Sequence, residues 1–156
     1  MDKALLRSPS GIAFNGDASV IYVADTGNHR IIMIKDGSVT TLAGKLSGFD
    51  EDGDPLGGYG AGTVDDAQFN LPKGLELVGD TLVIADSGNN MVRAITASGR
   101  VVTVAGSSEP GDIGGHPLQA RFTHPSGVAY HGGRLYIADT TNNKVKVMPF
   151  DIDLYK

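Results

Sequence analysis

The sequence predicts an all-β fold built from three four-stranded antiparallel blades of a β-propeller. Composition is the first observation behind this prediction, because 22 of the 156 residues are glycine and seven are proline. Residues of this kind favour turns, so their abundance indicates many short strands joined by turns. Internal repetition is the second observation, since a four-stranded unit repeated at about 40 to 60 residues is typical of propeller blades.

The repeat has three matching parts in each unit. Its core is an apolar run, Ala-Asp, two small residues, Asn and a second apolar run, found at 21–34, 82–95 and 135–148. Pro-x-Gly and an apolar residue precede each core, and Val-x-Thr-x-Ala-Gly follows the first two cores, at 39–44 and 101–106. Chance does not produce this order repeatedly, so the chain contains equivalent units.

Each unit is expected to form four short strands. In the first unit these are runs rich in Val, Ile, Tyr and Thr at 11–15, 19–25, 30–35 and 38–44, bounded by Gly, Asp and Asn. The Ala-Asp-x-x-Asn core predicts a tight turn after the second strand, because Asp and Asn bond nearby backbone groups and tolerate left-handed dihedral angles. Asp36-Gly37 predicts the hairpin that joins the third and fourth strands.

The units predict one domain with blades at about 1–45, 69–106 and 122–156. Two long inter-blade loops, 45–68 and 107–121, separate the blades. The third unit ends differently from the others, because 151–156 stands where Val-x-Thr-x-Ala-Gly is expected.

The repeated residues resemble a known family. Pro-x-Gly, the Ala-Asp-Thr-Gly-Asn-His-Arg core at 24–30 and the segment at 39–44 are similar to the NHL repeat, which is named after Asn-His-Leu. The acidic loop after the first unit is also similar to the NHL module that some proteins fuse to a thioredoxin-like domain. The corresponding triplets here are Asn28-His29-Arg30, Asn89-Asn90-Met91 and Asn142-Asn143-Lys144.

This resemblance implies a propeller of five or six blades, and it does not imply a single function. NHL propellers bind RNA, bind proteins, act as extracellular sensors or have a lyase activity. Function therefore has to be argued from the residues of this chain.

Three blades would form about half of a six-bladed ring. An open row leaves an apolar sheet face uncovered at each end, about several hundred Å² in area, and patches of that size mark interaction surfaces. Two chains joined head to tail about a twofold axis would cover both faces. The alternatives are further blades from a longer propeller and a second domain covered by the wedge, and we expect the homodimer.

Acidic and amide residues recur at the same turn of every unit. One interpretation is a ring of carboxylates, and the other is a structural turn in which each Asp caps nearby N–H groups. A catalytic site rarely needs the same residue in every repeat, so we expect structural roles. These residues are Asp25, Asn28, Asp86, Asn89, Asp139 and Asn142.

The first long loop opens with acidic residues at alternating positions, as a calcium loop does. The sixth position is Pro55 where Gly is required, and the twelfth is Ala61 where Glu is required. We therefore expect no cofactor, with calcium as the alternative. The acidic residues are Asp50, Glu51, Asp52 and Asp54.

The same loop is a candidate binding element, because loops of this length in compact proteins commonly carry function. Tyr59 lies in a glycine-rich stretch and is a candidate aromatic contact for a protein partner. His116 is the corresponding candidate in the second long loop. We predict these two residues and the acidic residues of the first loop as binding residues.

No catalytic constellation is evident. Cysteine is absent, and a zinc site would need three of the four histidines, at 29, 116, 124 and 131, to converge. His29 lies in the repeat turn, where we expect it at the surface. Gly-x-Ser-x-Gly is also absent. We predict no metal site and no catalytic residues.

Charge and basic residues argue against nucleic acid as a partner. The formal net charge is −5, which opposes binding to a phosphate backbone. The basic residues of the third strands are expected to form a solvated face, with RNA binding as the alternative. They are Arg30, Arg93, Lys144 and Lys146.

The sequence therefore predicts a non-enzymatic scaffold that binds a protein or peptide and is completed by homodimerisation. A metal-dependent lyase or lactonase-like enzyme with a site in the central channel is the first alternative, and an RNA-binding module is the second. The lack of cysteine and of an apolar signal segment predicts a cytoplasmic protein, and no stretch predicts a membrane helix.

Overall fold

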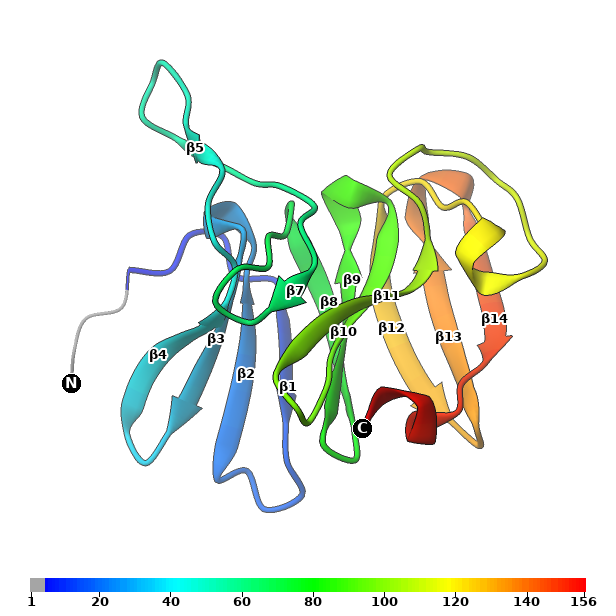
Figure 1. The fold of residues 1–156 in the computed structure, drawn as a ribbon, viewed down its shortest axis with the longest axis horizontal. Coiled ribbons are helices and arrows are strands. Elements are labelled where there is room, and N and C mark those ends of the chain that lie inside the picture. The colour runs from blue at the N-terminus through cyan, green and yellow to red at the C-terminus, as the bar shows by residue number, and fades with distance from the viewer. Residues whose placement is uncertain (1–4) are drawn as a thin grey trace.

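A computed structural model describes residues 5–156 and shows three sheets side by side, fanned into a wedge (Figure 1). The predicted first blade begins at residue 1, and its first four residues lie outside the described part. Strands in every sheet run antiparallel to their neighbours, as expected from the short runs and tight turns. No helix within residues 5–156 has the length and apolar character needed to cross a membrane.

The first blade has the four strands expected from its sequence. They are β1 (Gly11–Phe14), β2 (Val20–Asp25), β3 (Arg30–Lys35) and β4 (Ser38–Ala43), hydrogen-bonded in that order. A single 3₁₀ turn, η1 (Thr26–Asn28), joins β2 to β3 and ends at His29, whose φ of 53° is left-handed.

The second blade repeats this arrangement and adds a fifth strand. Its repeat strands are β8 (Pro72–Val78), β9 (Thr81–Asp86), β10 (Met91–Ile95) and β11 (Arg100–Gly106), with η2 (Ser87–Asn89) between β9 and β10. The extra strand is β7 (Gly62–Thr63), which comes from the preceding long loop and pairs with β11. The same loop forms a small hairpin from β5 (Gly48–Phe49) and β6 (Pro55–Leu56), which projects from the wedge (Figure 1).

The third blade has three strands, so the prediction of four strands per blade holds only for the first. These strands are β12 (Pro125–His131), β13 (Arg134–Asp139) and β14 (Lys144–Pro149), with η4 (Thr140–Asn142) at the repeat turn and η3 (Pro117–Gln119) in the preceding loop.

The chain after β14 turns back toward the core. Phe150 is 3% exposed and stacks on Tyr155 at 4.9 Å between ring centroids, and the 3₁₀ turn η5 (Ile152–Tyr155) holds that arrangement. Burial of these rings favours the turn over an extended fourth strand.

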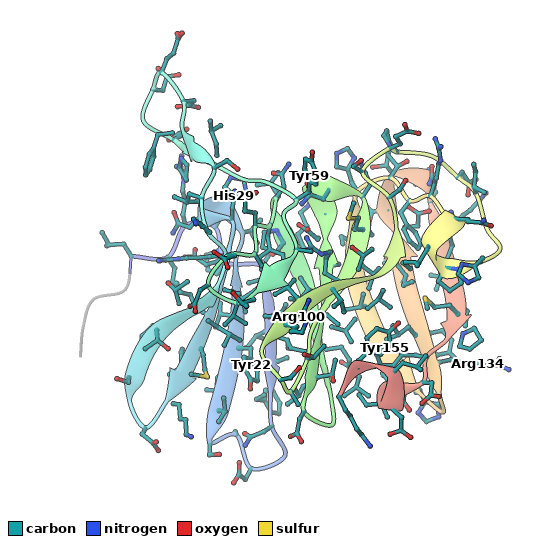
Figure 2. The ribbon with its side chains drawn as sticks, viewed as in Figure 1. Tyr22, His29, Tyr59, Arg100, Arg134 and Tyr155 are labelled. Atoms are coloured by element: carbon teal, nitrogen blue, oxygen red, sulfur yellow. The ribbon has the colours of Figure 1, made fainter. Side chains whose placement is uncertain are left out.

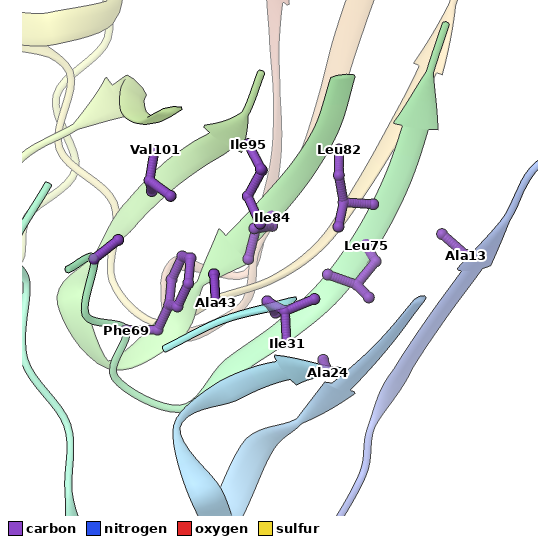
Figure 3. Packing of buried hydrophobic residues seen from close by; sticks show 11 residues of the cluster. Ala13, Ala24, Ile31, Ala43, Phe69, Leu75, Leu82, Ile84, Ile95 and Val101 are labelled. Carbon is purple, nitrogen blue, oxygen red and sulfur yellow. The ribbon is translucent and has the colours of Figure 1, made fainter. Parts of the chain in front are cut away.

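The hydrophobic core lies between the blades. One cluster fills the space between the first and second sheets and includes Ile31, Phe69 and Ile84, all fully buried (Figure 3). A second cluster fills the space between the second and third sheets and includes Val92 and Phe122. Each blade therefore depends on its neighbour for the burial of its apolar face.

The two end faces of the wedge show what an uncovered blade exposes. Ile12 of the first blade is 63% exposed, whereas its equivalent in the second blade, Leu75, is 7% exposed. At the other end Val145 is 67% exposed, whereas its equivalents Ile31 and Val92 are fully buried. The faces have the same apolar character, so the difference comes from the neighbouring sheet.

Candidate functional site

The repeated Asp residues form the same buried hydrogen-bonded site in every blade. Asp86 is fully buried and accepts hydrogen bonds from the backbone N–H of Asn70 at 2.8 Å and from Asn89 Nδ2 at 2.8 Å. The equivalent carboxylates repeat both bonds. Asp25 accepts from Arg7 N and Asn28 Nδ2, and Asp139 accepts from Thr123 N and Asn142 Nδ2.

These bonds add a second partner to the local cap expected from the sequence. None of the three Asp side chains accepts a bond from a backbone N–H of the 3₁₀ turn that follows it, although each accepts one from the side-chain amide of the Asn in that turn. Each also binds the segment that enters its own blade, 16 or 18 residues upstream. The expected local bond is therefore present through the Asn side chain, and the backbone N–H that binds each carboxylate belongs to the entering segment.

A basic side chain completes each site, and in the second blade it is fully buried. Arg93 Nη1 lies 3.3 Å from Asp86 Oδ2, and the guanidinium also donates to the backbone carbonyls of Gln68 and Gly60. It lies 5.5 Å from the centroid of the Phe69 ring. The prediction of a solvated face is wrong for Arg93, because the long loop folds over this side chain.

Burial and hydrogen bonding have opposite effects on the pKa of the Asp86 carboxyl group. Desolvation raises the pKa of Asp86 to about 6, and the bonds from Asn89, Asn70 and Arg93 act to lower it. At neutral pH the group is therefore ionised and balances the charge of Arg93.

The buried sites fix the bases of the inter-blade loops. Asn89 Nδ2 donates to the carbonyl of Gly58 at 2.7 Å, and Asn142 Nδ2 donates to that of Gly111 at 2.8 Å. Because each loop base is bonded to a buried carboxylate site, the exposed part of the loop projects from a fixed frame.

The predicted binding residues of the first loop lie on the projecting hairpin and beside it. Asp50 Oδ1 accepts from the backbone N–H groups of Asp52 and Asp54, so this carboxylate closes the hairpin turn. Asp54 also pairs with Arg7 at 2.8 Å. Tyr59 is 69% exposed on the same side of the molecule (Figure 2).

The structure does not bring the predicted residues of the two loops together. His116 precedes η3 beside the third blade, whereas the acidic hairpin projects beside the first (Figure 1). Among residues 5–156, no three His, Asp or Glu side chains are grouped closely enough to hold a metal ion.

His29 has a role that its position in the repeat turn did not predict. It is 9% exposed, whereas a surface position was expected, and its Nδ1 accepts a hydrogen bond from the backbone N–H of Leu71 at 3.0 Å. Asn90 Oδ1 accepts from His124 N at 3.0 Å in the same way. These bonds join neighbouring blades, and the repetition of a side-chain acceptor after Asn28 and Asn89 was the available signal.

Comparison with known proteins identifies the repeat. A family model described as the NHL repeat matches residues 6–32 and 122–148, and each match contains one buried Asp–Asn site. A chicken (Gallus gallus) protein named NHL repeat-containing protein 2 is 31% identical over 96% of this chain. The chain carries NHL repeats.

The chain spans 22% of the length of the chicken protein. Among solved structures, a protein of unknown function from Bacteroides thetaiotaomicron superposes with a TM-score of 0.75 and 22% identity, over 91% of this chain and 36% of that one. An auxiliary nutrient binding protein from Bacteroides ovatus gives a TM-score of 0.73 and 25% identity, over 90% and 37%. These likenesses and the antiparallel sheets show an all-β partial propeller.

Acid is expected to weaken the joint between the first two NHL blades through His29. Burial is the largest effect on His29 and lowers its pKa below the ordinary value of 6.5. A hydrogen bond with the backbone of Pro55 acts to raise this pKa, and the positive charge of Arg7 acts to lower it. The folded state therefore binds fewer protons than the unfolded state, so stability is lost as pH falls below 6.5. A protonated Nδ1 also cannot accept the Leu71 hydrogen bond.

The measurement is urea unfolding of the wild type and of His29→Asn at pH 7.5 and pH 5. Asn occupies the equivalent position in the second blade, and Asp86 is common to both proteins. We expect a larger loss of stability at pH 5 in the wild type. Equal losses would show that His29 does not carry the acid sensitivity.

Proposed function

We propose that the chain is a non-enzymatic scaffold that binds a protein or peptide through the β5–β6 hairpin and Tyr59. The observation that carries this proposal is a group of exposed large apolar side chains on a projecting loop. Phe49 is 65% exposed, Leu56 is 43% exposed and Tyr59 is 69% exposed. Exposed aromatic groups of this kind commonly supply most of the energy of a protein contact.

The anchored base of the loop supports this role. Gly58 N donates to the carbonyl of Phe69, and the Gly58 carbonyl accepts from Asn89, so the residue beside Tyr59 is fixed on both sides. A preorganised loop loses less conformational entropy when it binds than a free segment does.

Charge at the hairpin favours a partner that carries basic residues. Asp50, Glu51, Asp52 and Asp54 surround the hairpin turn and are exposed. Their carboxylates would speed association with a positively charged segment and make it sensitive to salt. The ligand class that fits this surface is a peptide segment with aromatic or aliphatic anchors and flanking Lys or Arg residues.

As a second part of the proposal, a second copy of the chain completes the propeller. Support comes from the uncovered apolar faces at both ends of the wedge, where Ile12 and Val145 are exposed although their equivalents inside the wedge are buried. Head-to-tail pairing about a twofold axis would cover both faces with one kind of interface.

A displayed peptide library selected on the purified chain tests the binding part of the proposal. We expect enriched peptides to combine basic and aromatic residues and to bind Phe49→Ser/Tyr59→Ser at least about tenfold more weakly, because exposed anchors dominate such contacts. Leu118→Ser is the matched control, since Leu118 is 56% exposed on the other long loop. Failure to enrich any peptide, or equal binding to both variants, would contradict the proposal.

A further inference from the structure

Each joint between neighbouring blades contains the same hydrogen bond, which we call the inter-blade latch. Its acceptor is the side chain of the residue that ends the 3₁₀ turn, and its donor is the backbone N–H of the residue before the repeat proline of the next blade. His29 and Leu71 form the first latch, and Asn90 and His124 form the second, both at 3.0 Å.

Both halves of the latch have a characteristic backbone conformation. The acceptor residues His29 and Asn90 have φ of 53° and 57°, and the donor residues Leu71 and His124 have φ of 49° and 50°. All four angles lie in the left-handed region, which residues other than glycine rarely occupy. The inter-blade joint therefore has a backbone geometry that can be recognised elsewhere in the chain.

The two ends of the wedge carry the two unused halves of this latch. Asn143 follows the last repeat turn with φ of 55°, is exposed, and its side chain bonds no residue within 5–156. Ser8 precedes the first repeat proline with φ of 49°, and its N–H has no acceptor in the same range. The third blade thus offers the acceptor, Asn143, and the segment before the first blade offers the matching donor, Ser8 N–H.

The repeat glycine of each blade lies on the sheet face beside these residues, and in the two buried joints another blade packs on it. A Cβ on Gly11 would lie 1.9 Å from the Lys73 carbonyl oxygen, and one on Gly74 would lie 2.7 Å from Gly127 Cα, because the next blade packs directly on these glycines. A Cβ on Gly127 meets only Ala138 Cβ, at 3.4 Å. The third blade therefore keeps a glycine contact surface that no described residue uses.

We infer that the third blade of one copy binds the first blade of a second copy through a third latch, in which Ser8 N–H donates to Asn143 Oδ1. In this interface Ile12 and Phe14 of one copy pack on Val145 and Val147 of the other, and Gly127 lies against the entering β1. The inference rests on the homodimer part of the proposed function and specifies its contacts.

Continuity with the joints inside the chain supports a second copy as the occupant. Within the chain, the second and third blades each pack on the preceding blade through a latch donor, a repeat proline and an apolar face. Its own head has the same donor geometry and the same exposed apolar positions, at Ser8 and Ile12. Two such head-to-tail contacts close a ring with a twofold axis.

The first experiment measures the mass of the purified chain and the dissociation constant of its dimer. Light scattering after size exclusion should give about twice 16.2 kDa. Asn143→Ala should raise the dissociation constant by about a hundredfold, because the dimer has two latches and each unpaired amide costs a factor of about ten. Asp36→Ala is the control, since Asp36 is exposed with φ of 50° in the β3–β4 turn, away from the interface.

Two further variants separate the latch from general damage to the third blade. Asn143→His should keep the dimer at pH 7.5 and lose it at pH 5, because a neutral imidazole accepts the hydrogen bond and a protonated one does not. Gly127→Ala should block dimerisation, and its monomer should keep the circular dichroism spectrum of the wild type, since only Ala138 Cβ lies near the new methyl group.

The outcomes distinguish the inference from the proposal on which it rests. A wild-type monomer at micromolar concentration would overturn both the homodimer and the latch, and would favour further blades or another domain as the cover. A wild-type dimer that Asn143→Ala and Gly127→Ala leave unchanged would overturn the latch and keep the homodimer. Loss of the dimer in these two variants, but not in Asp36→Ala, supports the inference.

Discussion

Replacement of Asp86 by Asn is expected to lower the free energy of unfolding by about 3 to 5 kcal/mol at pH 7.5. The variant leaves the Arg93 guanidinium without its counter-charge, although its side chain is only 1% exposed and cannot lose its proton. It also replaces an acceptor of the Asn89 side chain with an amide that competes as a donor. Urea unfolding followed by circular dichroism measures the loss.

Asp25→Asn provides the matched control for this prediction. Asp25 occupies the same position in the first blade, but its partner Arg30 keeps a side-chain exposure of 27%, so water can solvate the guanidinium. We expect a loss of about 1 to 2 kcal/mol, mainly from disturbed hydrogen bonds. Equal losses in the two variants would show that burial of Arg93 does not set the cost.

The double variant Asp86→Asn/Arg93→Met extends the test. Removal of both charges should recover part of the stability lost in Asp86→Asn, because an apolar side chain has no desolvation penalty in this buried position, whereas an unpaired guanidinium does. If the double variant is less stable than Asp86→Asn, the bonds from Arg93 to the loop carbonyls outweigh its unpaired charge.

Gly11→Ala is expected to separate the first blade from the second. The new methyl group would lie 1.9 Å from the Lys73 carbonyl oxygen and 3.0 Å from its carbon, and both atoms belong to the backbone of β8. The sheets must therefore move apart, which opens the cluster that contains Ile31 and Ile84. We expect a loss of about 3 kcal/mol or more, the upper range for overpacking of a core.

Gly16→Ala is the control for this prediction, because no heavy atom lies within 4 Å of a Cβ at that glycine.

Unfolding of Gly11→Ala is also expected to be less cooperative than that of the wild type. Because each blade packs only on its neighbours, the first blade should melt before the rest. Hydrogen exchange should then show lower protection in β2 and β3 than in β9 and β10. A single sharp transition at wild-type stability would mean that the blades do not pack as described.

Local residue chemistry was sufficient to predict the strands of the first blade and the repeat turns. The alternation of apolar runs with Gly, Asp and Asn predicted β1 to β4, because strand and turn preferences depend on a few adjacent residues. The resemblance of the repeat to the NHL family was confirmed by the family match and by the relatives. The acidic hairpin and Tyr59 remain predicted binding residues.

Short-range patterns along the chain were therefore enough to predict the repeat, the antiparallel strands and the positions of the repeat turns. Three features could not be predicted in this way: Arg93 is buried, His29 joins two blades, and the chain after β14 forms η5. Each of these outcomes depends on a segment distant in sequence: the loop that covers Arg93, the backbone of Leu71, and the second blade against which Phe150 and Ile152 pack. Burial is a property of neighbours in space, and the local pattern around a residue does not specify them.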